Sequence, residues 1–336
     1  MTSRERVHRT LQFDNPERVP RQLWTLPWAL NNHKEQVDRL RKDFPDDITM
    51  VQGFLHRKPA TRGDPFEIGE YTDEWGCKFT NVHRGIIGEI KEPLLKGEDW
   101  EDRDALILPE EMLAVDTGKV NSFCSETELF VIAGACPRPF ERLQFLRGTE
   151  QLFVDLMQRP AGMFSVMNKV HDYYCRELEV WAQTDVDALM IMDDWGSQNS
   201  LLINPELWVE IFKPLYADYL HIAHGHGKKM FMHSDGYILQ ILPHLVELGL
   251  DAINSQIFCM GLEQLKQFKG KITFWGEMDR QHLLPDGTAE DIHDAVKKVK
   301  DALYDQGGCI AQCEFGPGGN PDNVRAVFEA WDRNPA

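Results

Sequence analysis

The chain has 336 residues, of which 42% are hydrophobic and 27% are charged, and its formal net charge is −18. These values are typical of a globular protein with one large or two smaller domains. A surface this acidic repels phosphate groups, which argues against nucleic acid and anionic membranes as partners.

The N-terminal segment, residues 1–20, lacks the apolar stretch of a secretion signal, and no run in the chain is apolar enough to cross a bilayer. The seven cysteines are scattered and odd in number, as is typical of reduced thiols. We therefore expect a cytoplasmic protein. Ser3 can cap a first helix over RERVHRTLQ, which Pro16 and Pro20 end.

Two apolar runs, RVPRQLW and DITMVQGF, predict the first strands. Residues 55–126 then differ, because EIGEYTDEWGCKFTNVHRGIIGEI consists of short alternating pieces with glycines between them. This pattern predicts hairpins. We interpret residues 55–126 as an insertion that packs over the C-terminal mouth of the fold, a candidate lid.

From Glu128 onward, apolar runs alternate with amphipathic helical stretches. The runs are LFVIAGACP, DALMIMDDW, KKMFMHSDG, LDAINSQIF, KITFWGEMD and GCIAQCEFG. Such alternation predicts parallel strands covered by helices. With the two earlier runs the strands number eight, which favours a single α/β domain over residues 1–336, a TIM (β/α)8 barrel. A doubly wound open sheet is the alternative.

In a TIM barrel the active site lies at the C-terminal ends of the strands. His233 and Asp235 stand two residues apart at such an end, and side chains two apart in a strand point the same way. They can therefore form a metal site or an acid–base pair, with Gly236 allowing the turn that follows. In the alternative interpretation Asp235 caps a helix starting at Tyr237, and His233 is a satisfied core histidine.

Two further strand ends carry carboxylates. Asp193 and Asp194 are adjacent and point to opposite faces, so only one can face the lumen while the other caps or pairs behind it. Glu277 follows Phe-Trp-Gly, and a carboxylate there is expected to be partly buried. It would then bind metal, or pair with an arginine such as Arg280 or Arg142.

Cysteine and histidine give weaker signals. Cys313 stands near the end of the last predicted strand and could supply a thiolate ligand, although no CxxC pair supports it. His221, His224 and His226 resemble a metal cluster in sequence. They fall at a helix end among glycines, where histidine stabilises the negative pole, and we favour that interpretation.

Many segments, in order, resemble the uroporphyrinogen decarboxylase superfamily, which includes zinc- and corrinoid-linked methyltransferases. The superfamily is a TIM barrel, in agreement with the strand count. True uroporphyrinogen decarboxylases carry an R-Q-A-G-R segment after the first strand, but this chain reads RVPRQLWTLPWALNNH there. The resemblance therefore implies the methyltransferase branch. It covers SRERVHRTLQFDNPERVP, DEWG, FERLQFLRGTE, DDWGSQ, NPELWVEIFKP, HGKKMFMHSDG, GLDAINSQ, WGEMDRQHLLPDGT and PDNV.

That branch binds zinc with an H-x-C motif at the fifth strand, a glutamate near the sixth and a cysteine near the eighth. His233 matches the histidine, while Asp235 stands at the first cysteine and Gln256 at the glutamate. Cys313 matches the last cysteine only after a small shift, since Phe315 is the literal match. The thiolate-rich site is not reproduced. The resemblance instead implies a harder site for a divalent metal, zinc in the first place, held by His233, Asp235, Glu277 and Cys313 or Glu314.

The sequence thus predicts a cobamide-dependent methyltransferase acting on a methylated small molecule, with the cobamide on a separate corrinoid protein as methyl acceptor. Asp193, Asp194, Arg142 and Gln256 are the predicted catalytic residues. The alternative is a metal-free decarboxylase or lyase, in which Arg142 holds a carboxylate and Asp194 or His233 handles the proton. A third interpretation is a non-catalytic barrel that binds a small molecule. A homodimer is compatible with each.

Overall fold

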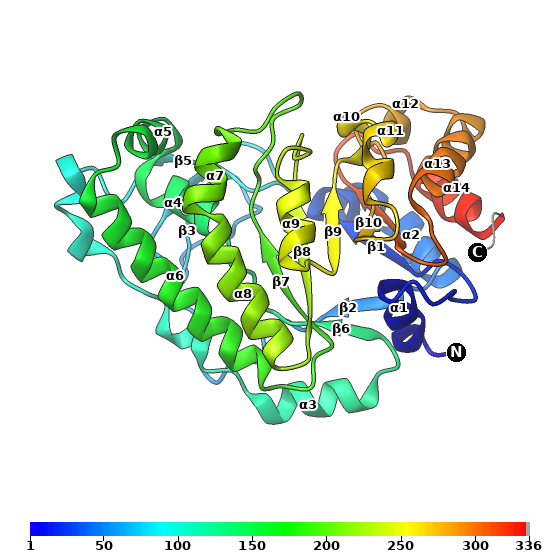
Figure 1. Ribbon diagram of the computed structural model, residues 1–336, viewed down its shortest axis with the longest axis horizontal. Helices are drawn as coiled ribbons and strands as arrows, with labels where there is room; N and C mark the ends of the chain where they lie inside the picture. The colour runs from blue at the N-terminus through cyan, green and yellow to red at the C-terminus, as the bar shows by residue number, and fades with distance from the viewer. Residues whose placement is uncertain (334–336) are drawn as a thin grey trace.

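Eight parallel strands surrounded by helices form the body of the computed structural model, which describes residues 1–333 (Figure 1). Neighbouring strands pair in parallel in the order β1-β11-β10-β9-β8-β7-β6-β2. The TIM-barrel prediction is confirmed, and the open-sheet alternative is wrong. The strands are β1 Arg21–Thr25, β2 Ile48–Met50, β6 Phe130–Ile132, β7 Ala188–Met192, β8 Lys229–Ser234, β9 Ala252–Ser255, β10 Thr273–Trp275 and β11 Cys309–Phe315.

The seam between β1 and β2 is closed by the residues just before β2. The amide of Asp47 donates to the carbonyl of Arg21 at 2.9 Å. The amide of Leu23 donates to the carboxylate of Asp46 at 2.7 Å. These bonds replace a regular ladder and leave the barrel nearly closed.

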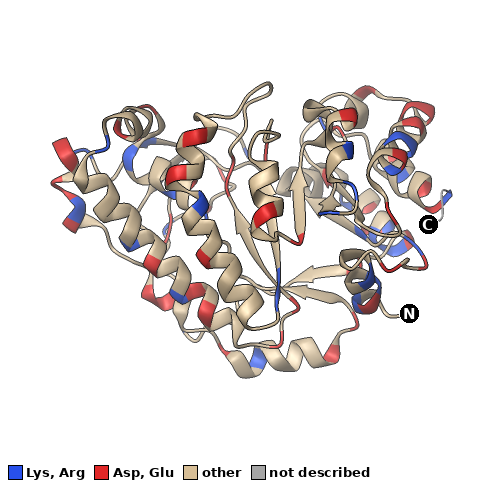
Figure 2. Cartoon of the chain, viewed as in Figure 1, with Lys and Arg blue, Asp and Glu red and all other residues tan. Residues whose placement is uncertain are grey.

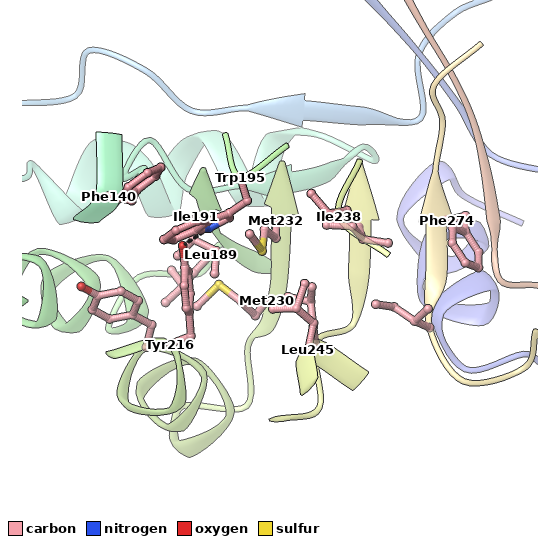
Figure 3. Packing of buried hydrophobic residues seen from close by; sticks show 14 of the residues in the cluster. Phe140, Leu189, Ile191, Trp195, Tyr216, Met230, Met232, Ile238, Leu245 and Phe274 are labelled. Atoms are coloured by element: carbon pink, nitrogen blue, oxygen red, sulfur yellow. Dashed lines mark hydrogen bonds between the residues drawn. The ribbon is translucent and has the colours of Figure 1, made fainter. Parts of the chain in front are cut away.

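Side chains alternate between the lumen and the helix layer, as the two-residue period of a strand requires. Leu189, Ile191, Met230 and Met232 pack outward against the helices (Figure 3). The inward residues form a separate cluster that includes Ile48, Phe130, Ile132, Ala188, Met190, Phe231, Ala252, Trp275 and Ile310. This phase decides which polar residue at each strand end faces the lumen.

Helix α1, Ser3–Leu11, contributes Val7 and Leu11 to the inward cluster. Its N-cap is Thr2, not Ser3 as expected, because Thr2 and Glu5 form a reciprocal capping box. Pairing of the Glu5 carboxylate with the amide of Thr2 places the first turn one residue earlier.

The outer helices carry charges of both signs, interleaved along the chain (Figure 2). No helix within residues 1–333 has the length and apolar character needed to cross a membrane. The remaining α-helices are α2 Pro27–Asp43, α3 Thr117–Glu126, α4 Pro139–Arg147, α5 Thr149–Gln158, α6 Ala161–Ala182, α7 Pro205–Ile211, α8 Lys213–Gly225, α9 Leu242–Leu248, α10 Ile257–Met260, α11 Leu262–Leu265, α12 Leu283–Asp286, α13 Ala289–Leu303 and α14 Pro321–Arg333.

The expected insertion contains an antiparallel sheet of β3 Gly69–Thr72, β4 Lys78–Asn81 and β5 Glu89–Glu92. Its remaining regular elements are 3-10 turns at Glu98–Trp100, Arg103–Ala105 and Glu110–Leu113. A bridge between Leu55 and Val115 ties its two ends together. The insertion therefore spans 55–115, while α3 belongs to the helix layer and lies along the lower edge in Figure 1, away from β5.

Candidate active site

The side chains of Asp194, His233 and Asp235 converge at the C-terminal ends of β7 and β8. His233 is buried, and its Nε2 lies 3.6 Å from Oδ1 of Asp194 and 3.7 Å from Oδ1 of Asp235. One candidate ligand atom from each residue lies within 4.8 Å of the other two. The predicted His233–Asp235 pair is thus brought together, and Asp194 completes a group of three.

The ring of His233 is oriented by Asn254 at the end of β9. Nδ1 of His233 lies 2.5 Å from Oδ1 of Asn254, whose side-chain amide donates to the carbonyl of Trp275. Nδ1 therefore carries a proton, and in the neutral ring Nε2 presents its lone pair to the two aspartates. Burial lowers the pKa of His233, but the charges of Asp235 and Asp194 outweigh it, and the pKa is raised.

The loops after β7 and β8 touch at two glycines. Gly236 has φ of +77°, and a Cβ there would lie 2.2 Å from the carbonyl oxygen of Gly196. The amide of Asp235 donates to Oδ1 of Asp194 at 2.9 Å, which fixes that carboxylate beside the imidazole. The nearest regular α-helix starts only at Leu242, so the structure does not support the interpretation of Asp235 as a helix cap.

Asp193 faces the other way and supports the site from behind. Its buried carboxylate accepts hydrogen bonds from the amides of Phe140 and Glu141 at 3.0 and 2.8 Å. It also accepts one from the hydroxyl of Tyr216 at 2.6 Å. Asp193 therefore holds the first turn of α4, and of the two adjacent carboxylates only Asp194 reaches the lumen.

Glu277 is buried, at 1% exposure, and neither of its oxygens has a hydrogen-bond partner among residues 1–333. Nε of Arg280 lies 3.7 Å from it. Burial raises the pKa of Glu277 to about 7. Arg280 also pairs with Asp235 and Glu314, so one guanidinium serves three carboxylates and the mouth keeps a net negative charge.

Gln256 lies beside this group. Its Oε1 accepts from the amide of Gly236 at 3.3 Å. Together with Glu277 and Arg280 it lines a cavity of about 150 Å³. The structure thus places Gln256 and Glu277 next to the three convergent residues, as the positions at the strand ends predicted.

Cys313 is not in the site, which corrects the expectation that it is a ligand. Its side chain packs in the outer core between strand and helices and is fully buried. Burial raises the pKa of the thiol. Alternation along β11 instead puts Ile310 and Glu314 on the lumen side, and Glu314 pairs with Arg280.

Arg142 lies apart from the convergent trio. Its guanidinium donates to Asp73 at 2.6 Å and lies 4.7 Å from the ring centroid of Trp75, both in the insertion. The histidines near the end of α8 also lie elsewhere. His224 and His226 pair at the surface with Asp251 and Glu179, which agrees with their interpretation as residues of a helix end.

The three convergent residues fit a divalent metal ion. Oδ1 of Asp235 is buried without a hydrogen-bond partner, and it faces the free Nε2 of His233. Metal–ligand bonds of about 2.0–2.1 Å separate tetrahedral ligands by roughly 3.3 Å, so separations of 3.6 and 3.7 Å need only a small contraction. The carboxylates of the mouth outnumber its one guanidinium group, that of Arg280, so the mouth favours binding of a cation.

Comparison with known proteins shows the family to which the chain belongs. The model of the family described as Uroporphyrinogen decarboxylase (URO-D) matches residues 73–333. The chain belongs to the uroporphyrinogen decarboxylase family. None of the curated proteins matches it in sequence.

Solved structures share the fold at low identity. A methyltransferase from Methanosarcina mazei is 11% identical, with 99% of each chain covered and a TM-score of 0.70. A B12-independent methionine synthase from Shewanella sp. W3-18-1 is 12% identical, with 90% of this chain and 85% of that chain covered and a TM-score of 0.47. At 11% identity, the likeness to the Methanosarcina mazei protein shows the fold alone.

Sequence reasoning missed Glu141 and treated Arg280 only as a partner of Glu277. It recognised Asn254 at a strand end but gave it no role, although Asn254 shares the inward phase of Ala252 on β9. Glu141 is the second residue after Pro139 in α4. Burial raises the pKa of Glu141, and the nearby charge of Asp194 raises it further. Nothing in the sequence indicates that Glu141 lies near Asp194.

Proposed function

We propose that the protein is a methyltransferase that binds a divalent metal ion, zinc in the first place, through His233, Asp194 and Asp235. The methyl donor is a methylated small molecule, and the acceptor is a cobamide carried by a separate corrinoid protein. The observation that carries the proposal is the free Nε2 of His233 facing two carboxylates. Membership of the family and the shared fold of a methyltransferase add support.

The residues of the mouth have distinct roles in this proposal. His233, Asp194 and Asp235 would hold the divalent ion, which would supply Lewis-acid chemistry toward the heteroatom that carries the methyl group. Asn254 fixes the ring of His233, and Arg280 fixes Asp235. Gln256, which lines the cavity, orients the substrate.

Glu277 supplies the proton in this scheme. Its carboxyl is buried and has no hydrogen-bond partner among the described residues, so it is free to donate to a substrate atom. The bond from the methyl carbon to the heteroatom breaks, and its electron pair stays on the heteroatom. That atom takes the proton of Glu277, and the electron pair of the new bond comes from the acceptor.

Metal analysis tests the proposal. We expect about one equivalent of zinc in protein purified without chelator. His233→Ala and Asp235→Ala should each lower zinc affinity at least 100-fold. Their far-ultraviolet circular dichroism spectra should stay unchanged. His221→Ala, an exposed histidine on α8, is the matched control and should keep its zinc. Zinc added to the stripped wild type should raise its melting temperature, because it binds only the folded state.

If the wild type holds no stoichiometric metal and zinc does not change its melting temperature, the proposal fails. The mouth would then be an acid–base site without metal, as in the decarboxylase alternative. That alternative would also have to displace Asp73 from Arg142 before a substrate carboxylate could bind there.

A further inference from the structure

A second cavity, of about 310 Å³, lies between the insertion and the barrel. The insertion contributes Phe66, Tyr71, Trp75 and Phe79, and the barrel side is formed by the segment after β6 and by helices α4 and α6. Its volume falls within the range of small-molecule sites. Cys136, which lines it, also packs against the inward cluster of the barrel, so the cavity lies beside the lumen.

Glu177 on α6 lines this cavity and has no partner. It is 5% exposed, and within residues 1–333 no hydrogen bond or ion pair reaches its carboxylate. A buried carboxylate without a partner is costly, and in a cavity wall it marks a place for a ligand that supplies the missing charge or donor.

The charges around Glu177 show which ligand would complete the site. Arg142 is paired with Asp73 at 2.6 Å and approaches Glu74 at 3.6 Å. Arg138 approaches Glu141 at 3.8 Å. Both guanidiniums therefore already have carboxylates, and Glu177 is the acid left over.

The walls add aromatic faces to the unpaired carboxyl group of Glu177. Tyr173 and Tyr174 stand one turn before Glu177 on α6, and the ring centroid of Trp75 lies 4.9 and 5.6 Å from theirs, respectively. Aromatic faces with a carboxylate are the usual surroundings of a substituted ammonium ion in proteins.

We infer that this cavity binds an organic ammonium ion, with Glu177 as its counter-ion and the aromatic side chains of the insertion and α6 around it. The inference rests on the proposed function in one respect: if both hold, the methylated small molecule carries an ammonium group in addition to the heteroatom that gives up its methyl group. Glu177 contacts the ligand in this assignment and takes no part in bond breaking.

Binding should depend on pH. Burial, together with the charge of Glu74, raises the pKa of Glu177 to about 8, against the opposing effect of Arg142 and Arg138. Tyr173, Tyr174 and Cys136 also face this cavity. The empty cavity therefore holds a mostly protonated Glu177 at pH 7, and a bound cation favours loss of that proton. Affinity for a cation should rise about tenfold between pH 7 and pH 9, the change in ionised fraction that a pKa of about 8 gives.

Titration calorimetry with choline tests the inference, with 3,3-dimethylbutan-1-ol as its uncharged isostere. We expect choline to bind at least tenfold more tightly than the isostere and to release a proton at pH 7. Glu177→Gln should weaken choline binding at least tenfold and remove the pH dependence. Glu179→Gln, on the same helix but paired with His226 at the surface, is the control and should change neither.

Equal binding of choline and its isostere would overturn the inference, as would an undiminished affinity in Glu177→Gln. Absence of choline binding at millimolar concentration up to pH 9 would also overturn it. His233→Ala should still bind choline, because the ammonium site does not include the metal ligands. Loss of zinc with retained choline binding therefore separates failure of the metal proposal from failure of this inference.

Discussion

The two ends of the barrel treat buried carboxylates in opposite ways. At the N-terminal end Asp47, fully buried, accepts hydrogen bonds from Arg6, Arg18, Ser3 and the amide of Arg21. These donors overcome the effect of burial and lower the pKa of Asp47. Two guanidinium groups, those of Arg6 and Arg18, pair with this one carboxylate, and both oxygens of Asp47 are satisfied.

At the C-terminal end the balance is reversed. Arg280 alone serves Asp235, Glu277 and Glu314. Oδ1 of Asp235 and both carboxylate oxygens of Glu277 have no hydrogen-bond partner among residues 1–333. In a TIM barrel the N-terminal face stabilises and the C-terminal face carries the chemistry. In this chain the division is seen in the carboxylates: Asp47 at the N-terminal end has all its hydrogen bonds, whereas Asp235 and Glu277 at the C-terminal end lack some of theirs.

The largest expected effect is at the saturated end. Asp47→Ala leaves Arg6 and Arg18 without their buried partner, so the free energy of unfolding should fall by about 3–5 kcal/mol. Zinc binding per folded molecule should not change. Urea unfolding measures the first effect, and Asp43→Ala, which removes a surface pair with Arg325, should cost less than about 1 kcal/mol. If the two variants lose equal stability, the cluster of Asp47 with Arg6 and Arg18 does not stabilise the fold.

At the C-terminal end of the barrel, Glu277→Gln should raise the free energy of unfolding instead of lowering it. The folded-state pKa of Glu277, about 7, lies above its ordinary value, so ionisation costs stability as pH rises from about 4.5 to 7. In metal-free protein the substitution should therefore raise stability by about 3 kcal/mol at pH 8 and leave it unchanged at pH 4.

Urea unfolding at both pH values measures this difference. Glu263→Gln, on the surface beside Lys266, is the control and should have little effect at either pH. Destabilisation of Glu277→Gln at pH 8 would show that the carboxylate has a partner in the folded protein, and the contrast between the two ends would weaken.

The smallest effect concerns Arg280. Replacing it with glutamine removes the permanent positive charge beside Asp235, so the affinity of the mouth for zinc should rise about tenfold, or about 1.4 kcal/mol. Competition with a chelating dye measures the affinity, with Arg325→Gln as a distant control. A fall in zinc affinity would mean that Arg280 matters more for positioning Asp235 than through its charge.

The eight strands were predictable because each is a short apolar run between amphipathic helices. The partition of Asp193 and Asp194 was predictable from the two-residue period. The same period could have excluded Cys313, since Ile310 and Glu314 share the inward phase of β11. A polar residue does not by itself show whether it points into the lumen or toward the helices. The apolar residues two positions away on the same strand show that direction.

Other parts of the site depend on contacts that no local pattern encodes. The pairing of Arg142 with Asp73 joins residues 69 positions apart in the chain. The unpaired state of Glu177 follows from the position of the insertion on α6, and the sequence of α6 reads only as an ordinary amphipathic helix. Charge balance in a buried cluster is a property of the assembled fold.

The bridge between Leu55 and Val115 gives the insertion a modular character. A segment whose ends meet can be lengthened, shortened or exchanged without moving β2 or α3, because the distance that it spans stays the same. The trio at the mouth comes from β7 and β8, while much of the aromatic wall of the ammonium cavity comes from the exchangeable segment. A change within this one segment can therefore alter the wall of that cavity and leave the trio on β7 and β8 intact.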